Sequence, residues 1–261
     1  MSIEAAVLPT EYTPPGTEDF WIPLIGDGAW AFTRASLLAI ISVALLWWWL
    51  HATTRKRAVV PSMGQMGTEA VYDFVRNDIA RDLIGSKEFM RFVPLLFAQF
   101  IFILLNNFFG VVPPFQNPTM GRIGFPIALT LVVFVVYHVV GMQKHGFVGY
   151  WKSLVPPGLP KPMIPVIFFL ELITDIFTRP VTLALRLFGN MFAGHVMMIL
   201  FIGGGWYMLT NGGIVLPVAG AVTWIMAFVM TLFELLVEVL QAYVFTLLTA
   251  LYIGGALADE H

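Results

Sequence analysis

Two long apolar stretches of this sequence, residues 163–202 and 214–257, are interrupted by polar side chains that could hold or pass protons. The first stretch carries Glu171, Asp175, Arg179, Arg186, Asn190 and His195, and the second carries Glu234, Glu238, Gln241 and Tyr252. Because each residue of a helix turns by about 100°, each set follows one stripe along its helix, except that His195 falls on the other side. Two polar stripes on neighbouring helices indicate a hydrated path between or beside them.

Arg186 is the residue for which a purely structural role is hardest to accept. It lies between Leu185 and Leu187, well inside the apolar run and more than 15 residues from either end of it. A central arginine costs ~2.5–3.5 kcal/mol even on the lenient insertion scale. Its pKa above about 12 excludes it as a proton carrier. It can hold a permanent positive charge that blocks cations and attracts a carboxylate.

The other polar residues divide into proton carriers and groups with plainer interpretations. Histidine and a buried carboxyl group can titrate near neutral pH, so His195 and Glu234 can pass protons along. Asp175 and Arg179 are spaced i, i+4, so a local ion pair is an alternative to a transport role. Glu171 lies either at the membrane interface or in a channel. Asn190 is either channel-lining or a polar contact between helices.

The composition predicts an all-α integral membrane protein. The chain is 58% hydrophobic and 11% charged, whereas soluble domains are about half apolar and about a quarter charged. Apolar stretches at 31–51, 90–112, 125–143, 163–202 and 214–257 predict about five membrane helices. His138 and His145, at the end of the third stretch, are predicted to be interfacial. Residues 64–84 predict an amphipathic surface helix, with an ordinary polar-faced connector as the alternative.

The last two stretches are too long to cross a membrane upright. Each covers about 40 residues, or roughly 60 Å of helix, against a hydrocarbon core of ~30 Å. Either they form a strongly tilted antiparallel hairpin over about 163–257, or each breaks into two pieces. Pro180, Gly203–Gly205 and Pro217 are the candidate break points.

Lysine and arginine gather in the expected loops at 52–91 and 144–162 and are absent from the loop at 203–213. The positive-inside rule therefore predicts an external N-terminus and a cytoplasmic C-terminus. Residues 1–30 are acidic and proline-rich, which predicts an exterior tail rather than a signal peptide. A single membrane domain at 31–257 and a cytoplasmic tail at 258–261 complete the predicted organisation.

Several classes of function lack their sequence signals. A net charge of −2 gives no reason to expect nucleic acid as a partner. The sequence contains no cysteine and no phosphate-binding GxxxxGK[ST] loop, GxSxG or HExxH motif. We therefore expect no cofactor, no metal and no nucleotide site in this chain itself.

Two strings carry a family resemblance. The run from Pro180 to His195, PVTLALRLFGNMFAGH, resembles the signature of subunit a of F-type ATP synthases. The run from Glu238 to Tyr252 is similar to the last helix of that family. With the span pattern, the resemblance covers nearly the whole chain from residue 30.

The resemblance implies roles for individual residues. Arg186 matches the essential arginine that faces the rotor, and Asn190 and Gln241 match polar residues near it. His195 and Glu234 match a pair lining the outer half-channel, with acid and histidine exchanged relative to some members. Glu238 joins this outer set. Glu171, Asp175 and Tyr252 are assigned to the inner path, Glu171 and Asp175 only approximately, because the spacing of the acidic residue to the arginine varies between branches.

Helix spacing agrees with the outer pair. His195 lies nine residues from Arg186, or ~13 Å, and Glu234 lies seven residues from Gln241, or ~10 Å. If Gln241 is level with Arg186 in an antiparallel hairpin, His195 and Glu234 lie at nearly the same depth.

The family also implies partners: a ring of c subunits with one buried carboxylate each, peripheral-stalk b-type subunits, the soluble ATPase sector indirectly, and membrane lipid. The expected function is proton conduction to the ring through two offset half-channels in a bacterial plasma membrane. An organelle inner membrane, and sodium in place of protons, stay open. The alternatives are a proton-coupled secondary transporter, which usually shows repeated halves, and a non-conducting scaffold, which has no use for a central arginine.

Overall fold

The computed structural model describes residues 23–26, 31–55, 62–112, 115–155, 159–160, 162–210 and 215–258. Most of the predicted N-terminal tail, the basic residues Lys56 and Arg57, and the last three residues of the predicted cytoplasmic tail lie outside this part of the chain. Five of the described helices are long and apolar enough to cross a membrane. They are α1 (Arg34–Thr54), α4 (Val93–Val111), α5 (Gly124–Ser153), the continuous helix Ile164–Thr210, and α8 (Val215–Leu257). The predicted all-α membrane fold is confirmed.

The fourth membrane helix is continuous over 47 residues. It consists of α6 (Ile164–Ile173), a π-helical turn (Thr174–Thr178) and α7 (Arg179–Thr210). Pro180 does not break it, although proline lacks an N–H and crowds the carbonyl four residues earlier. The wider π turn just before Pro180 absorbs this conflict, with the Arg179 N–H bonded five residues back to Thr174.

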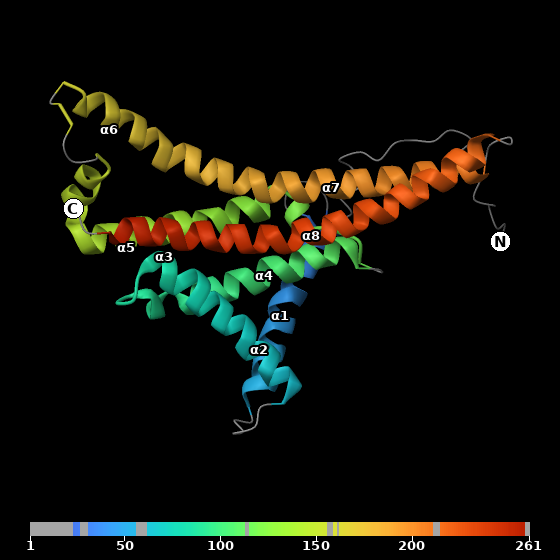
Figure 1. The fold of residues 1–261 in the computed structure, drawn as a ribbon, viewed down its shortest axis with the longest axis horizontal. Helices are drawn as coiled ribbons and strands as arrows, with labels where there is room; N and C mark the ends of the chain where they lie inside the picture. The colour runs from blue at the N-terminus through green and yellow to red at the C-terminus, as the bar shows by residue number, and fades with distance from the viewer. Residues whose placement is uncertain are drawn as a thin grey trace.

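The other two expected break points are also helical. Residues 203–210, predicted as a loop, belong to α7, and Pro217 lies in the first turn of α8. The glycines of α7 serve close packing instead: a Cβ on Gly205 would lie 2.4 Å from Cδ1 of Trp224 on α8. A Cβ on Gly220 of α8 would lie 2.9 Å from the Gly205 carbonyl oxygen. Figure 1 shows α7 lying along α8 and α4 on the other side of α8, and α5 contacts both α7 and α8.

Helix α5 is longer than predicted and bends at Gly146. Gly146 has φ 73°, a left-handed conformation that glycine adopts readily. The segment after it, predicted as the start of a loop, is helical to Ser153 and folds back onto the first part of α5. A Cβ on Gly141 would lie 2.4 Å from the Tyr150 ring. The bend therefore returns Tyr150 to the interior of the molecule.

The predicted amphipathic segment forms α2 (Met63–Asp73), a π-helical segment (Phe74–Arg81) and α3 (Asp82–Ile84). Its apolar side, including the fully buried Val75 and Ile79, packs on α4 and α8 rather than facing outward. Gly254 of α8 permits the contact, because a Cβ there would meet the Leu83 carbonyl oxygen at 2.2 Å.

The remaining described elements are short. Strands β1 (Pro23–Ile25) and β2 (Phe32–Thr33) form an antiparallel pair, and 3₁₀ turns lie at Phe89–Arg91 and Thr119–Gly121. The buried core joins α4, α5, α7 and α8 through Leu96, Val133, Leu187, Phe245 and Ile253.

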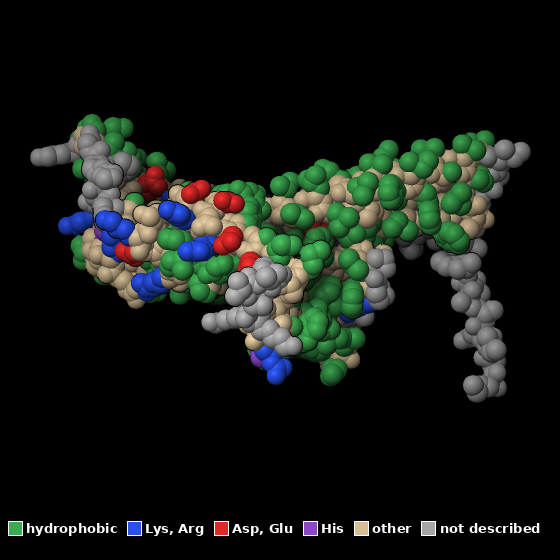
Figure 2. Space-filling view, turned by 60° about the horizontal axis from the view of Figure 1, so that its bottom comes forward, with side chains coloured by type: hydrophobic (Ala, Val, Ile, Leu, Met, Phe, Trp, Pro, Cys, Tyr) green, Lys and Arg blue, Asp and Glu red, His purple; other side chains and the backbone are tan. Residues whose placement is uncertain are grey.

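The surface divides by character (Figure 2). Charged side chains gather at one end of the face drawn there, whereas the arm formed by α7 and α8 is covered by hydrophobic side chains. On the fourth membrane helix Phe177, Val181 and Leu185 follow one another at four-residue intervals and are each at least half exposed. A surface of this kind faces lipid or another protein.

Candidate ion-translocation site

Helices α7 and α8 are joined by a polar contact near their middle. Nδ2 of Asn190 donates a hydrogen bond to Oε1 of Gln241 at 2.8 Å. Gln241 is therefore level with Asn190, one helical turn from Arg186. The expected spacing takes Gln241 as level with Arg186, so the structure shifts the register of the two helices by one turn.

A cavity of about 310 Å³ lies next to this contact, lined by both helices. Its lining includes Asn190, Gly194 and Glu234. Glu234 is 4% exposed and its carboxyl group lies directly over Gly194, where a Cβ would be 3.3 Å from Oε1. Both carboxyl oxygens lack a hydrogen-bond partner among the described residues. A buried carboxyl in this state needs water or a bound proton to satisfy it.

His195 is buried beside this cavity but turns toward a different segment. Its ring makes a hydrogen bond with the backbone of Gln116, in the loop that follows α4. Gln116 has φ 38°, so this loop turns sharply at the contact. The structure therefore places His195 and Glu234 on adjoining turns of the hairpin, with Glu234 against Gly194 and His195 against the loop.

Glu238 is fully buried and faces α4. Nδ2 of Asn107 donates to the Glu238 backbone oxygen at 3.2 Å, and a Cβ on Gly110 would lie 3.4 Å from Glu238 Oε1. Asn106 and Asn107 are both fully buried. Sequence reasoning missed these two amides. The available signal was a pair of adjacent asparagines within the second apolar stretch.

Along the fourth membrane helix, Arg186 lies between the cavity of about 310 Å³ and the group of polar residues around Asp175, which is called the inner group after the predicted inner path. Its side chain is half-buried, and among the described residues it forms no ion pair. Thr182 and Asn190, one turn to either side of it, are exposed. The arginine is thus close to a face of α7 that no other described part of the chain covers.

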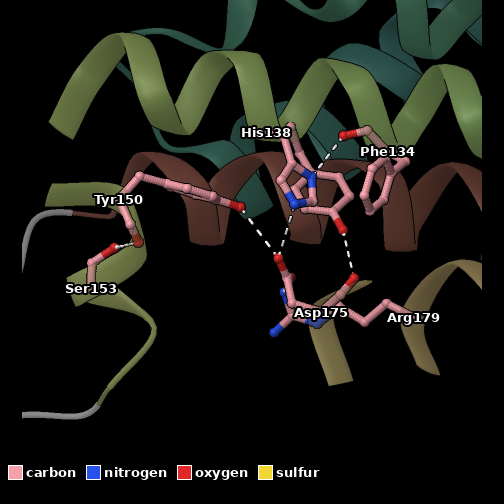
Figure 3. A network of polar contacts seen from close by, with 7 residues as sticks. Phe134, His138, Tyr150, Ser153, Asp175 and Arg179 are labelled. Atoms are coloured by element: carbon pink, nitrogen blue, oxygen red, sulfur yellow. Dashed lines mark hydrogen bonds and ion pairs between the residues drawn. The ribbon is translucent and has the colours of Figure 1, made fainter. Parts of the chain in front are cut away.

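Asp175 is the centre of the inner group (Figure 3). It is fully buried in the π turn and forms an ion pair with Arg179, which confirms the predicted local pair. His138 Nε2 lies 3.3 Å from Asp175 Oδ2, and the Tyr150 hydroxyl donates to the same oxygen at 3.4 Å. Tyr137 donates to the Asp175 backbone oxygen at 3.0 Å. Four polar side chains thus converge on one residue.

His138 is 7% exposed and faces Asp175, so it lies inside the molecule, and its interfacial depth stays a prediction. It lies about two helical turns before the bend at Gly146, on the first part of α5. Tyr150 was also missed. Only the reversal at Gly146 brings it to this site, and spacing along one helix gives no signal of such a contact.

An inner cavity of about 510 Å³ lies beside this group. Glu171, Arg179, Tyr252, Tyr137 and Tyr150 are among its lining residues. The Arg179 guanidinium lies over the Tyr252 ring at 5.4 Å from its centroid, a cation–π contact. Glu171 is half-buried. Two residues of the predicted inner path, Glu171 and Tyr252, therefore line the same cavity. The third, Asp175, is buried behind the lining residues Tyr150 and Arg179.

These features define a class: a multi-pass helical membrane protein with ionisable groups inside its spans, arranged along two long antiparallel helices. The family model of the ATP synthase A chain matches residues 35–254. The chain is 44% identical to the ATP synthase subunit a of Nocardioides sp. (strain JS614), with both chains covered in full. It is 39% identical to that of Pseudarthrobacter chlorophenolicus, over 96% of each chain, and 39% identical to that of Streptomyces lividans, over 96% of this chain and 89% of the relative.

The chain belongs to this family, subunit a of the membrane sector of F-type ATP synthases.

Proposed function

We propose that this chain is the proton-conducting stator subunit of a bacterial F-type ATP synthase and that it offers two offset half-channels to a rotor ring. The observation that carries the proposal is the position of Arg186. It is a half-buried arginine with no ion pair among the described residues. It lies between a mostly apolar cavity that Glu234 lines and a second cavity lined by Glu171 and Arg179, and beside an uncovered face. Because a charged arginine within a membrane is energetically costly, it needs a partner of opposite charge. A moving carboxylate on another subunit is a suitable partner.

The outer half-channel in this proposal uses Asn190, His195, Glu234, Glu238 and Gln241. The supporting features are the 310 Å³ cavity and the unpartnered carboxyl groups of Glu234 and Glu238. Water in this space would satisfy the carboxyl oxygens of Glu234, which lines it. A proton that enters here reaches a ring carboxylate beside Asn190, where α7 is exposed.

The inner half-channel uses the 510 Å³ cavity with Glu171 and Tyr252 in its lining and Asp175 behind it. A ring carboxylate that received its proton on the outer side is neutral and can pass through lipid, where a charged one would be too costly. It returns its proton at the inner cavity and passes Arg186 as an anion. The fixed charge of Arg186 prevents protons from moving directly between the two cavities.

The same proposal names the partners and the location. The exposed face of the fourth membrane helix, with Phe177, Val181 and Leu185, is the docking surface for the ring of c subunits. Peripheral-stalk b-type subunits and, through them, the soluble ATPase sector complete the assembly. The location is a bacterial plasma membrane, with the N-terminus outside and the C-terminus in the cytoplasm.

Replacement of Arg186 tests the proposal. Arg186→Ala is expected to abolish ATP synthesis driven by a proton gradient in membrane vesicles, while the complex still assembles with its full set of subunits. Arg55→Ala is the control, because Arg55 is an exposed arginine at the end of α1. Undiminished synthesis in an assembled Arg186→Ala complex would reject the proposed role of this residue.

A further inference from the structure

The ring of His138 faces hydrogen-bond acceptors at both of its nitrogens (Figure 3). Nδ1 lies 2.9 Å from the Phe134 backbone oxygen, and Nε2 lies 3.3 Å from Asp175 Oδ2. A backbone carbonyl can only accept a hydrogen bond, so Nδ1 carries a hydrogen. In a neutral imidazole the other nitrogen then has none, so Nε2 is an acceptor 3.3 Å from a carboxylate oxygen that is also an acceptor.

This arrangement is unfavourable unless one more proton is present. His138 is 7% exposed and Asp175 is fully buried, so bulk water does not screen the two lone pairs from each other. Nε2 has no hydrogen-bond partner among the described residues. One additional proton, carried by Nε2 or by Oδ2, turns two opposed acceptors into a donor and an acceptor.

The surrounding charges accommodate this extra proton. Arg179 pairs with the other oxygen of Asp175, and Tyr137, Tyr150 and Tyr252 are neutral groups facing the site. Glu171 lines the adjoining cavity together with Arg179. With both carboxylates ionised, Arg179 and a protonated His138 balance them, so the group of four is neutral as a whole. Without the extra proton it carries one uncompensated negative charge.

We propose that His138 and Asp175 share one exchangeable proton and form a proton-binding site that exchanges with the inner cavity through Tyr150. The Tyr150 hydroxyl lies 3.4 Å from Asp175 Oδ2, and Tyr150 also lines the cavity. The Tyr150 hydroxyl first rotates away from Oδ2 so that its proton points to water in the cavity. The shared proton then moves from Oδ2 to the Tyr150 oxygen as the hydroxyl proton moves to that water. One proton leaves the pair, one reaches the water, and Tyr150 is unchanged. The part this site plays in transport rests on the proposed function, whereas the shared proton does not.

Nitrogen NMR of the complete ATP synthase, labelled with ¹⁵N-histidine, tests for the shared proton. The His138 signal is identified as the one that is lost in the His138→Gln complex. We expect both His138 nitrogens to be protonated, or Nε2 to show a strong hydrogen bond to a shared proton, in the native protein near neutral pH. An Nε2 that is bare from pH 5 to pH 9 would overturn the proposal.

Asp175→Asn is the sharper variant, because the side-chain amide can donate to Nε2 without any added proton. His138 is then expected to become neutral at neutral pH. A doubly protonated His138 that persists unchanged in Asp175→Asn would show that Asp175 does not hold the proton. This comparison also identifies the His138 signal if the His138→Gln complex does not assemble.

Proton flux tests the transport role. In vesicles stripped of the soluble sector, His138→Gln is expected to slow passive proton conduction about tenfold or more, as loss of a positioned proton-transfer group does. A plot of the flux against the pH of the inner side should also show one titration step fewer. The solvent isotope effect on the flux should become smaller. His145→Gln, on the same helix, is the control. Unchanged rate, pH dependence and isotope effect in an assembled His138→Gln complex would remove His138 from the path.

The two proposals fail separately. A bare Nε2 together with an inactive Arg186→Ala complex would reject only the proton shared by His138 and Asp175. An active Arg186→Ala complex would reject the rotary assignment whatever the NMR result shows.

Discussion

Glu234 and Glu238 are buried carboxyl groups of α8 whose oxygens have no hydrogen-bond partner among the described residues. An unsatisfied buried polar group costs about 1–3 kcal/mol. The chain carries two of them one helical turn apart, beside a cavity that reaches only one of the pair, Glu234. At the scale of single residues, this cost is explained if water and mobile protons occupy the space, which is how the outer half-channel would be filled.

The space over Gly194 is the residue-scale feature that is simplest to test. Gly194→Leu would place a side chain where the Glu234 carboxyl now lies, 3.3 Å from the position of the added Cβ. ATP-driven proton pumping is expected to fall by about tenfold or more, since misplacing a reacting group by ~1 Å can cost ~100-fold. Fluorescence quenching in vesicles measures it. Gly67→Leu, where a Cβ meets nothing within 4 Å, should pump normally, and equal pumping by both variants would contradict the prediction.

The site residues differ in how far the sequence predicts them. Arg186, His195 and Glu234 are conspicuous because charge within an apolar run is costly, so composition and spacing identify them. Asn107, His138 and Tyr150 are not, because their polar contacts arise between helices that are distant in sequence. Tyr150 in particular depends on the reversal at Gly146, and a single glycine in a helical pattern does not by itself indicate such a turn.

At the scale of elements, the main feature is the close approach of α7 and α8. The sequence predicts their lengths and antiparallel arrangement, since apolar runs of this length have few alternatives. It does not predict that both remain unbroken. Gly203–Gly205 is one of three candidate break points in the sequence, whereas in the structure Gly205 is the point where the backbone of α7 meets Gly220 of α8. A glycine can interrupt a helix or let a second helix pack closely against it, and which of the two occurs depends on the partner helix.

Gly220→Ala tests this contact. The added Cβ would lie 2.9 Å from the Gly205 carbonyl oxygen and 3.0 Å from the Leu209 nitrogen, so the helices must separate. Overpacking of this kind costs about 1–3 kcal/mol. We expect a lower thermal stability of subunit a within the purified complex, followed by its loss from the complex on heating. Gly67→Ala, in an open helical position, should leave the temperature of the thermal transition unchanged or raise it. Equal stability of the two variants would show that the helices are not in contact here.

At the scale of the whole molecule, charge and apolar surface are separated (Figure 2). The helix Met63–Ile84 and the loop after it bring their charged residues to the same end of the molecule as the inner cavity, since α3 contacts α8 near Gly254. The positive-inside rule identifies such an end with the cytoplasm. The rule therefore predicts that this end, and with it the inner cavity, faces the cytoplasm.

Single cysteines can test this orientation, because the natural sequence contains none. Lys87→Cys, in an exposed position after α3, is expected to react with a membrane-impermeant maleimide only in inside-out vesicles. Ile123→Cys, 45% exposed before α5, is expected to react only in right-side-out vesicles. Labelling is measured by gel shift. The opposite pattern would invert the topology, and it would exchange the inner and outer cavities.

The unbroken helix Ile164–Thr210 has a geometric consequence. Its 47 residues extend for about 70 Å, more than twice the ~30 Å thickness of the oily layer. Such a rod fits only if it leans far over, so openings near its two ends are displaced sideways as well as in depth. If the proposed function holds, a proton that enters at one opening travels sideways on a ring carboxylate before it leaves at the other. A voltage across the membrane would then drive sideways movement, and sideways movement around a closed ring is rotation.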